Sequence, residues 1–244
     1  MIKAVVLDYI GTLTDARFYS LEISRAKLHQ ALAEVGFETN ENAFHVAYSK
    51  AHEKYRALRY EKLIEVTNAV WVCEALNSLG YKTNAEDPRL KVALNVFFQD
   101  YLNSLELRPF AKKLLKKIAE SCKLGLVSNF TYAPVVHSSL RKLGIGQFFN
   151  VILTSDEVGW RKPHKRIFEC ILNKLQVNAG ETVFIGDSPL EDIKGAHEAG
   201  MKTIFVSSQF NSLKNLYESH QKPDMTMEDL REIYGNLQKI LFLG

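Results

Sequence analysis

Side chains that can carry out chemistry follow short apolar runs, or lie a few residues beyond them, along this sequence. They comprise three acids, three hydroxyl residues, a lysine, an asparagine and a glycine: Asp8, Asp187, Asp192, Thr12, Ser128, Ser188, Lys162, Asn129 and Gly11. A carboxylate can attack an electrophilic centre, and a lysine stabilises the negative charge that develops there. Hydroxyl groups donate hydrogen bonds to anions, and carboxylate oxygens bind Mg²⁺. These residue types suit an attack on a small anionic substrate, provided that the fold brings them together.

The elements that would position these residues are short β-branched strands that alternate with helical segments. The alternation predicts strands at 3–8, 123–129, 149–155, 181–187 and 201–207, and helices at 111–121, 133–144, 164–176, 190–200 and 227–241. Runs that are apolar throughout are typical of parallel strands buried on both faces, and right-handed crossovers place helices on both sides. We therefore expect an α/β fold with a doubly wound, Rossmann-like parallel sheet. Ligands bind at the carboxyl ends of such strands, where the reactive residues fall.

Residues 16–103 interrupt this alternation directly after the first strand. They contain long helical patterns and no convincing strand, which predicts an all-helical cap domain inserted into an α/β core of residues 1–15 and 104–244. The two crossings, at 15–18 and 105–109, are expected to act as hinges. A closing cap excludes water and completes a site, so the choice of substrate is expected to depend on it.

Two features inside the predicted cap have alternative interpretations. The segment EKYRALRYEK (53–62) carries basic side chains, among them Arg59. It is interpreted either as a surface that meets an anionic substrate or as a solvated helix face. Trp71 and Phe97 are expected in the hydrophobic core of the cap rather than at a substrate.

Composition places further bounds on the protein. The 244 residues are 46% hydrophobic and carry a formal net charge of +3, which does not indicate a nucleic-acid or membrane partner. No apolar run approaches the roughly 18 residues of a membrane span. The three cysteines lie far apart and have no metal-binding spacing, so reduced thiols in a cytoplasmic protein are expected. We expect a monomer or a weak homodimer.

Four short motifs give this chain a resemblance to a known family. The stretches DYIGTL, VSN, RKP and GDSPLED are similar, in type and in order, to the four motifs of the haloacid dehalogenase-like (HAD) hydrolase superfamily. The resemblance covers the predicted core, and many members carry a helical cap where residues 16–103 stand. The motif set is specific to the superfamily and says little about the substrate.

The resemblance implies a role for each reactive residue. Asp8 would be the nucleophile that forms an aspartyl intermediate, with Lys162 stabilising the charge. Phosphate would be bound by Gly11, Thr12, Ser128, Asn129 and Lys162. Mg²⁺ would be held by Asp8, the main-chain carbonyl of Ile10, and Asp187. Ser188 would support the site, and Asp192 would hold Lys162 or a metal-bound water.

Ile10 departs from the pattern of HAD phosphatases, which typically have a second aspartate two residues after the nucleophile. That acid protonates the leaving alcohol, and such help is worth roughly 10²–10⁴-fold. Branches without it include 2-haloacid dehalogenases and phosphonatases. Four interpretations are therefore open: a Mg²⁺-dependent phosphatase in which another group replaces the acid, a metal-independent 2-haloacid dehalogenase, a phosphonatase that uses a cap lysine, and a degenerate binding module.

Asp187 favours the first interpretation. A second carboxylate beside Asp8 is unfavourable unless a cation offsets its charge. The dehalogenase branch has a Ser-Ser-Asn-like stretch at this motif and an arginine early in its cap, whereas this chain has Gly-Asp-Ser and the arginine-free stretch FETNEN. We therefore expect a phosphatase that acts on a small phosphorylated molecule, about the size of a triose phosphate.

Overall fold

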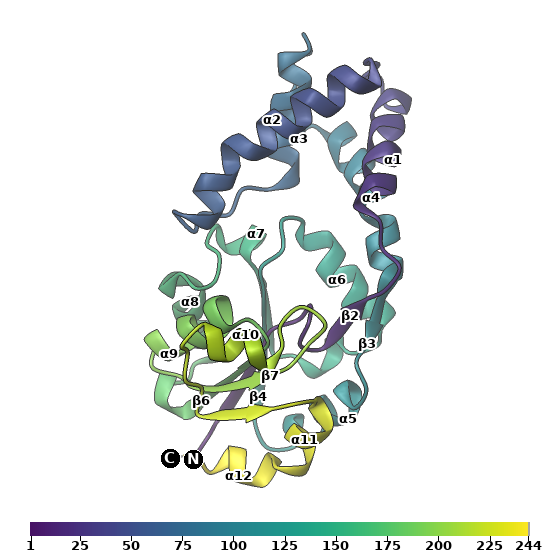
Figure 1. Cartoon of the computed structure of the whole chain (residues 1–244). Helices are drawn as coiled ribbons and strands as arrows, with labels where there is room; N and C mark the ends of the chain where they lie inside the picture. The colour runs from purple at the N-terminus through teal and green to yellow at the C-terminus, as the bar shows by residue number, and fades with distance from the viewer. Residues whose placement is uncertain (244) are drawn as a thin grey trace.

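A six-stranded parallel sheet forms the centre of the chain (Figure 1). The computed structural model describes residues 1–243. The strands are β1 (Ala4–Leu7), β4 (Lys123–Ser128), β5 (Val151–Thr154), β6 (Thr182–Gly186), β7 (Lys202–Val206) and β8 (Met225–Met227). They pair in the order β5-β4-β1-β6-β7-β8, and every pair is parallel. The predicted doubly wound sheet is confirmed.

Helices cover both faces of this sheet because its strands are apolar on both sides. In β1, Val5 and Leu7 pack into a cluster with α5 and α6, whereas Ala4 and Val6 pack against α8 and α9 on the opposite face. Alternation of side chains along a strand produces this division. The helices after the cap are α5 (Ala111–Ala119), α6 (Ala133–Lys142), α7 (Ser155–Val158), α8 (Lys165–Leu175), α9 (Lys194–Glu198), α10 (Leu213–Glu218), α11 (Leu230–Gly235) and α12 (Leu237–Leu241).

Four helices form the predicted insertion at the top of Figure 1. They are α1 (Leu21–Glu34), α2 (Glu41–Tyr60), α3 (Asn68–Ser78) and α4 (Pro88–Ser104). Side chains of Ser20, Asn40 and Asp87 accept hydrogen bonds at the starts of α1, α2 and α4, as helix N-caps do. Trp71 and Phe97 are buried in their common core, as predicted, and this core continues into Val135 of α6.

The chain crosses between core and cap through two paired strands, in the segments that the sequence predicted to act as hinges. β2 (Thr14–Ala16) and β3 (Leu105–Leu107) form an antiparallel ladder in which Thr14 pairs with Leu107. Strands of three residues are too short to show a period-2 pattern, so the sequence carried no signal for them. Whether these crossings bend stays a prediction.

The C-terminal segment also differs from the prediction of one helix over 227–241. Met227 belongs to the edge strand β8, and two short helices follow, with the side chain of Asp229 capping the first. The helix is interrupted after Gly235, at Asn236, because glycine weakens a helix and asparagine favours its ends.

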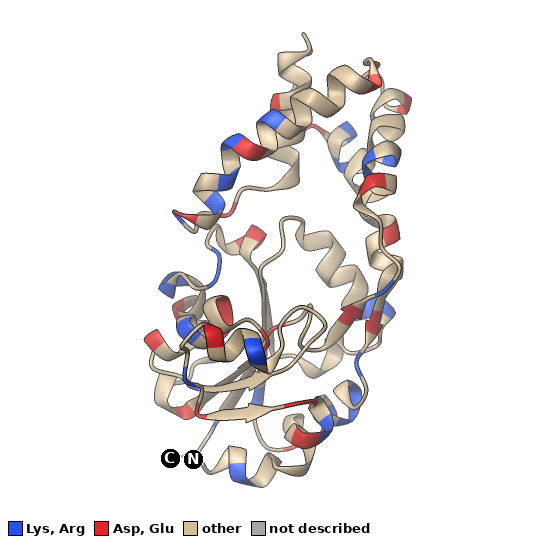
Figure 2. Cartoon of the chain, viewed as in Figure 1, with Lys and Arg blue, Asp and Glu red and all other residues tan. Residues whose placement is uncertain are grey.

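Charged side chains of both signs are interspersed over the core and the cap (Figure 2). The cysteines are all unpaired: Cys73 is buried, and Cys122 and Cys170 are half-buried. Among the helices of residues 1–243, none has both the length and the apolar content that crossing a bilayer requires.

Candidate active site

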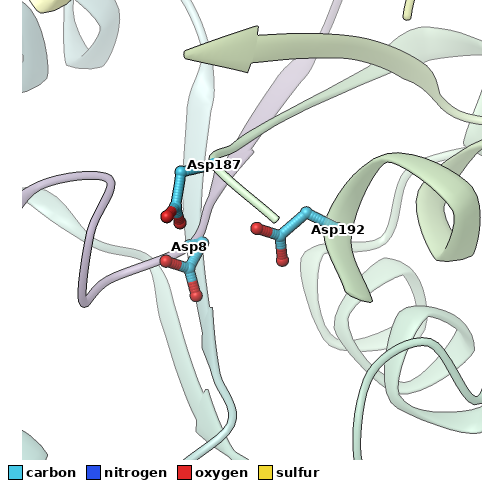
Figure 3. A group of neighbouring side chains, drawn as sticks. All are labelled: Asp8, Asp187 and Asp192. Carbon is cyan, nitrogen blue, oxygen red and sulfur yellow. The ribbon is translucent and has the colours of Figure 1, made fainter. Parts of the chain in front are cut away.

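Three aspartates meet at the carboxyl ends of two neighbouring central strands. Asp8 follows β1 and Asp187 follows β6, and these strands pair with Leu7 opposite Ile185. Asp192 comes from the helical turn that succeeds Asp187. All three residues are buried, and each offers one carboxylate oxygen within 4.8 Å of the others. Figure 3 shows the three carboxylates directed into the same space.

Lys162 is the buried cation of this group. Its Nζ lies 2.6 Å from Asp8 Oδ1 and 2.6 Å from Asp192 Oδ1, and it also donates to the carbonyl of Val127 at 3.1 Å. Asn129 holds the main chain of Lys162 from both sides, because its Oδ1 accepts from the Lys162 N–H at 2.8 Å and its Nδ2 donates to the Lys162 carbonyl at 3.0 Å. The ammonium group is therefore placed by main-chain contacts as well as by its ion pairs.

Three carboxylates and one ammonium group leave the buried cluster with an excess of negative charge. The pKa of Asp8 is raised to about 8, chiefly by burial; the attraction of Lys162 lowers it, and the charges of Asp192 and Asp187 raise it. Burial, followed by the charge of Asp192, also raises the pKa of Asp187. The pKa of Lys162 is raised, because the attraction of Asp192 and Asp8 outweighs its burial. Charged carboxylates at this position require a further cation.

The donor atoms of the cluster fit such a cation. Asp8 Oδ2 is buried and has no hydrogen-bond partner within residues 1–243, and an unpaired buried acceptor of this kind is costly unless something binds it. Oxygen atoms from several carboxylates are the ligands of Mg²⁺ and Ca²⁺. The residues present therefore suit a divalent metal ion.

Asp187 is held by hydrogen bonds from two loops. Thr12 Oγ1 donates to its Oδ1 at 3.3 Å, while Ser208 Oγ and Asn211 Nδ2 donate to its Oδ2 at 2.6 and 3.0 Å. Ser208 and Asn211 were not among the residues predicted for the site. They lie in the loop after β7, so applying the strand-end rule to that strand would have pointed to them.

Gly11 packs directly against Asp187. It adopts a φ of +97°, and a Cβ added to it would lie 2.6 Å from Asp187 Oδ2. Both observations require glycine here. Its N–H donates to the carbonyl of Thr14, and the Thr12 hydroxyl donates to Asp187. Binding of phosphate by Gly11 and Thr12 stays a prediction.

A cavity of about 320 Å³ lies over the cluster. It is lined by Asp8, Ile10, Ser128, Asn129, Asp187, Ser188, Glu191, Asp192, Phe210 and Asn211. Ser188 caps the following turn by accepting from the N–H of Glu191, and its own N–H donates to Asp192 Oδ2. Glu191 and Phe210 are additions that the motifs alone did not single out. The structure thus brings together every residue predicted for the site. Gly11, Thr12 and Lys162 are not among the lining residues but lie against Asp187 or Asp8.

Comparisons with known proteins agree with this geometry. A profile of the family described as haloacid dehalogenase-like hydrolase matches residues 39–206. The glyceraldehyde 3-phosphate phosphatase of Methanopyrus kandleri is 30% identical over 244 residues, which are 98% of this chain and 99% of that protein. The one from Methanothermobacter thermautotrophicus is 29% identical over 233 residues, 94% and 96% of the two chains.

Among solved structures, the fold is similar to that of a 2-haloacid dehalogenase from Pseudomonas syringae pv. Tomato DC3000. The TM-score is 0.70 at 24% identity, over 98% of this chain and 100% of the other. This likeness concerns the fold alone. On the strength of the profile match and the full-length relatives, the chain belongs to the haloacid dehalogenase-like hydrolases.

Proposed function

We propose that this protein is a Mg²⁺-dependent phosphatase that hydrolyses a small phosphate ester through an aspartyl-phosphate on Asp8. The observation that carries the proposal is the buried contact of Asp8 with Lys162, next to the second carboxylate Asp187. The relatives that match along their whole length are named phosphatases, which supports phosphate rather than halide chemistry.

The metal site in this proposal consists of Asp8, the main-chain carbonyl of Ile10, and Asp187. Mg²⁺ bound there would offset the excess negative charge of the cluster and shield the charge of the phosphate. A solved HAD hydrolase of the same fold, YfnB from Bacillus subtilis, is described as bound to magnesium, at 21% identity and a TM-score of 0.60. Asp192 and Ser188 act as supports: Asp192 pairs with Lys162, and Ser188 binds Asp192.

The protein's own groups divide the reaction into two steps. In the first, a carboxylate oxygen of Asp8 forms a bond to phosphorus while the ester P–O bond breaks and its electron pair leaves with the alcohol oxygen. In the second, a water oxygen forms a bond to phosphorus while the bond between phosphorus and the Asp8 oxygen breaks. Its electron pair restores the Asp8 carboxylate, and the water protons leave with the phosphate or to solvent. Lys162 stabilises the negative charge beside Asp8 in both steps. Ser128, at the end of β4, is the hydroxyl in the cavity wall that would bind a phosphoryl oxygen.

Ile10 cannot donate the proton that the leaving alcohol needs. In this proposal, the proton comes from water or from a group that the cap supplies. Halide leaves without such a proton, and therefore a 2-haloacid dehalogenase that uses Asp8 without a metal is the second candidate. The buried carboxylates of Asp8, Asp187 and Asp192 speak against this candidate. Among residues 1–243, Lys162 is the one cation paired with this cluster, and without a metal a single positive charge leaves the three carboxylates unbalanced.

The proposed substrate has the size of a triose phosphate. The full-length relatives are named glyceraldehyde 3-phosphate phosphatases, and a Yersinia pestis relative that is 31% identical over 67% of this chain is named phosphoglycolate phosphatase. A cavity of about 320 Å³ accommodates molecules of this size. Residues 16–103 would form the cap that selects the substrate, and residues 1–15 and 104–244 the catalytic core.

One panel of assays tests the proposal. Glyceraldehyde 3-phosphate, phosphoglycolate, p-nitrophenyl phosphate and 2-chloropropionate are each incubated with the protein, once with Mg²⁺ and once with a chelator. Release of phosphate only with Mg²⁺ supports the phosphatase, and release of chloride in the chelator supports the dehalogenase. Asp8→Asn is the control, since it removes the nucleophile and should abolish either activity.

A further inference from the structure

A buried carboxylate connects the helical insertion to the segment that carries Lys162. Glu65 lies between α2 and α3, and its side chain is fully buried. Its Oε1 accepts from Arg59 Nε at 3.0 Å, and its Oε2 accepts from Arg161 Nη1 at 2.7 Å. The hydroxyl of Ser155 also donates to Oε2. Arg59, interpreted from the sequence as a substrate contact or as part of a solvated face, is neither, because it is buried against this carboxylate.

The main chain makes the same connection. The Glu65 N–H donates to the carbonyl of Gly159 at 3.0 Å, and the Arg161 N–H donates to the carbonyl of Leu63 at 2.9 Å. These two bonds flank an antiparallel bridge between Ile64 and Trp160. Residues 63–65 are therefore paired with the loop that leads to Lys162, which attaches the insertion to the core at a point separate from the β2–β3 ladder.

From Arg161 the contacts continue to the active-site cavity. Arg161 Nη2 lies 3.7 Å from Oε1 of Glu191, which lines the cavity, and Oε2 of Glu191 accepts from Asn129 Nδ2 at 2.9 Å. Asn129 is the residue that holds the main chain of Lys162 on both sides. Arg161 thus reaches Lys162 by two routes, through the peptide bond that joins them and through Glu191 and Asn129.

The charges explain why Glu65 would matter to this arrangement. Two buried guanidinium groups, those of Arg59 and Arg161, share the Glu65 carboxylate, and the ring of Tyr60 lies 5.3 and 5.1 Å from them. Buried charged groups need partners, and an arginine that loses its carboxylate must turn toward another acid or toward water. For Arg161 the nearest remaining acid is Glu191, so the loss of Glu65 would shift the wall of the cavity.

We propose that Glu65 is a positioning residue for the hydrolase reaction: by holding Arg161, it fixes the segment of Lys162 and the orientation of Glu191. Turnover then depends on the contact between residues 63–65 and the core. The kinetic test of this inference rests on the proposed function, whereas a second test, by amide hydrogen exchange, does not depend on activity.

The kinetic test compares three glutamine variants with p-nitrophenyl phosphate as the substrate. Glu65→Gln removes the charge that holds Arg161, and Arg59→Gln breaks the same network on the side away from Lys162. Glu74→Gln removes a half-buried cap carboxylate that pairs with Lys54 and does not belong to this network. We expect Glu65→Gln to lower kcat at least tenfold with KM changed less than threefold. Arg59→Gln should lower the melting temperature but keep kcat within twofold, and Glu74→Gln should change neither.

If the role of Glu65 is purely structural, Glu65→Gln and Arg59→Gln should both lower the melting temperature. The value of kcat would then either stay unchanged in both variants or fall equally in both. Either pattern overturns the proposal. Should Glu65→Gln fail to fold, as judged by circular dichroism, Glu65→Asp replaces it. That variant keeps the charge but shortens the reach to Arg161, so the same fall in kcat is expected, and an unchanged kcat counts against the proposal.

The second readout is amide hydrogen exchange of residues 157–165. The Lys162 N–H is bonded to Asn129 Oδ1, so its exchange reports whether this segment is held. We expect at least tenfold faster exchange of this amide in Glu65→Gln and no change in Glu74→Gln. An unchanged rate overturns the positioning role whether or not the protein hydrolyses phosphate esters. Absence of turnover in the wild type, by contrast, refutes the proposed function alone.

Discussion

The excess negative charge around Asp8 predicts that removing this carboxylate stabilises the metal-free protein. In the folded chain the pKa of Asp8 is raised by burial from its ordinary value of 3.8 to about 8. The folded state therefore keeps a proton that the unfolded chain has lost. Between these two values the unfolded state binds fewer protons, so the stability of the metal-free wild type falls as the pH rises from about 4 to about 8.

The size of the effect follows from this shift. Each pKa unit corresponds to about 1.36 kcal/mol. At pH 7, about three units above 3.8, Asp8 therefore lowers the free energy of unfolding by roughly 4 kcal/mol. Asp8→Asn presents a neutral group of the same shape and removes this contribution, although it also loses part of the contact with Lys162. We expect the free energy of unfolding of Asp8→Asn to exceed that of the wild type by about 2–4 kcal/mol. For a chain of this size, this corresponds to roughly 5–15 °C in melting temperature.

The assay is thermal unfolding in excess chelator at several pH values from 4 to 8. The wild type and Asp8→Asn should unfold at similar temperatures near pH 4, and the variant should gain an increasing advantage up to pH 8. Asp100→Asn, which alters a half-buried aspartate paired with Lys27 outside the site, is the matched control and should stay within about 0.5 kcal/mol of the wild type. If Asp8→Asn unfolds at or below the wild-type temperature at pH 8, the site does not hold surplus negative charge.

Three further predictions concern the metal site, the turn after β1 and the missing acid. Mg²⁺ at 100 times its Kd should stabilise the wild type by about 2.7 kcal/mol in thermal unfolding, and Asp187→Asn should lose most of this gain; an equal gain in both proteins would exclude Asp187 as a ligand. Gly11→Ala should lower both stability and phosphatase activity, because its Cβ would overlap Asp187 in a left-handed conformation; wild-type kinetics would contradict the close packing. Ile10→Asp should raise kcat with glyceraldehyde 3-phosphate, whose leaving alcohol needs a proton, by up to the roughly 10²–10⁴-fold that a general acid contributes. A lower kcat would mean that another group already supplies the proton.

Much of the fold and the composition of the site could be predicted from the sequence alone. Continuous apolar runs such as the one before Asp8 reveal buried parallel strands, because both of their faces must avoid water. The position of a polar residue just after such a strand then places it at the carboxyl edge of the sheet. Asp8, Ser128 and Asp187, which line one cavity, and Lys162, which contacts Asp8, could be identified in this way.

Only the tertiary structure decided which contacts hold and bury the residues of the site. No local pattern indicates that Glu65 reaches Arg161, 96 positions away in the chain, or that Ser208 and Asn211 hold Asp187. The β2–β3 ladder likewise joins segments separated by the whole insertion. Sequence periodicity reports which face of an element is apolar, whereas pairing between distant polar groups depends on how loops close. Packing, not composition, thus determines the burial that raises the pKa of Asp8 and leaves room for a cation.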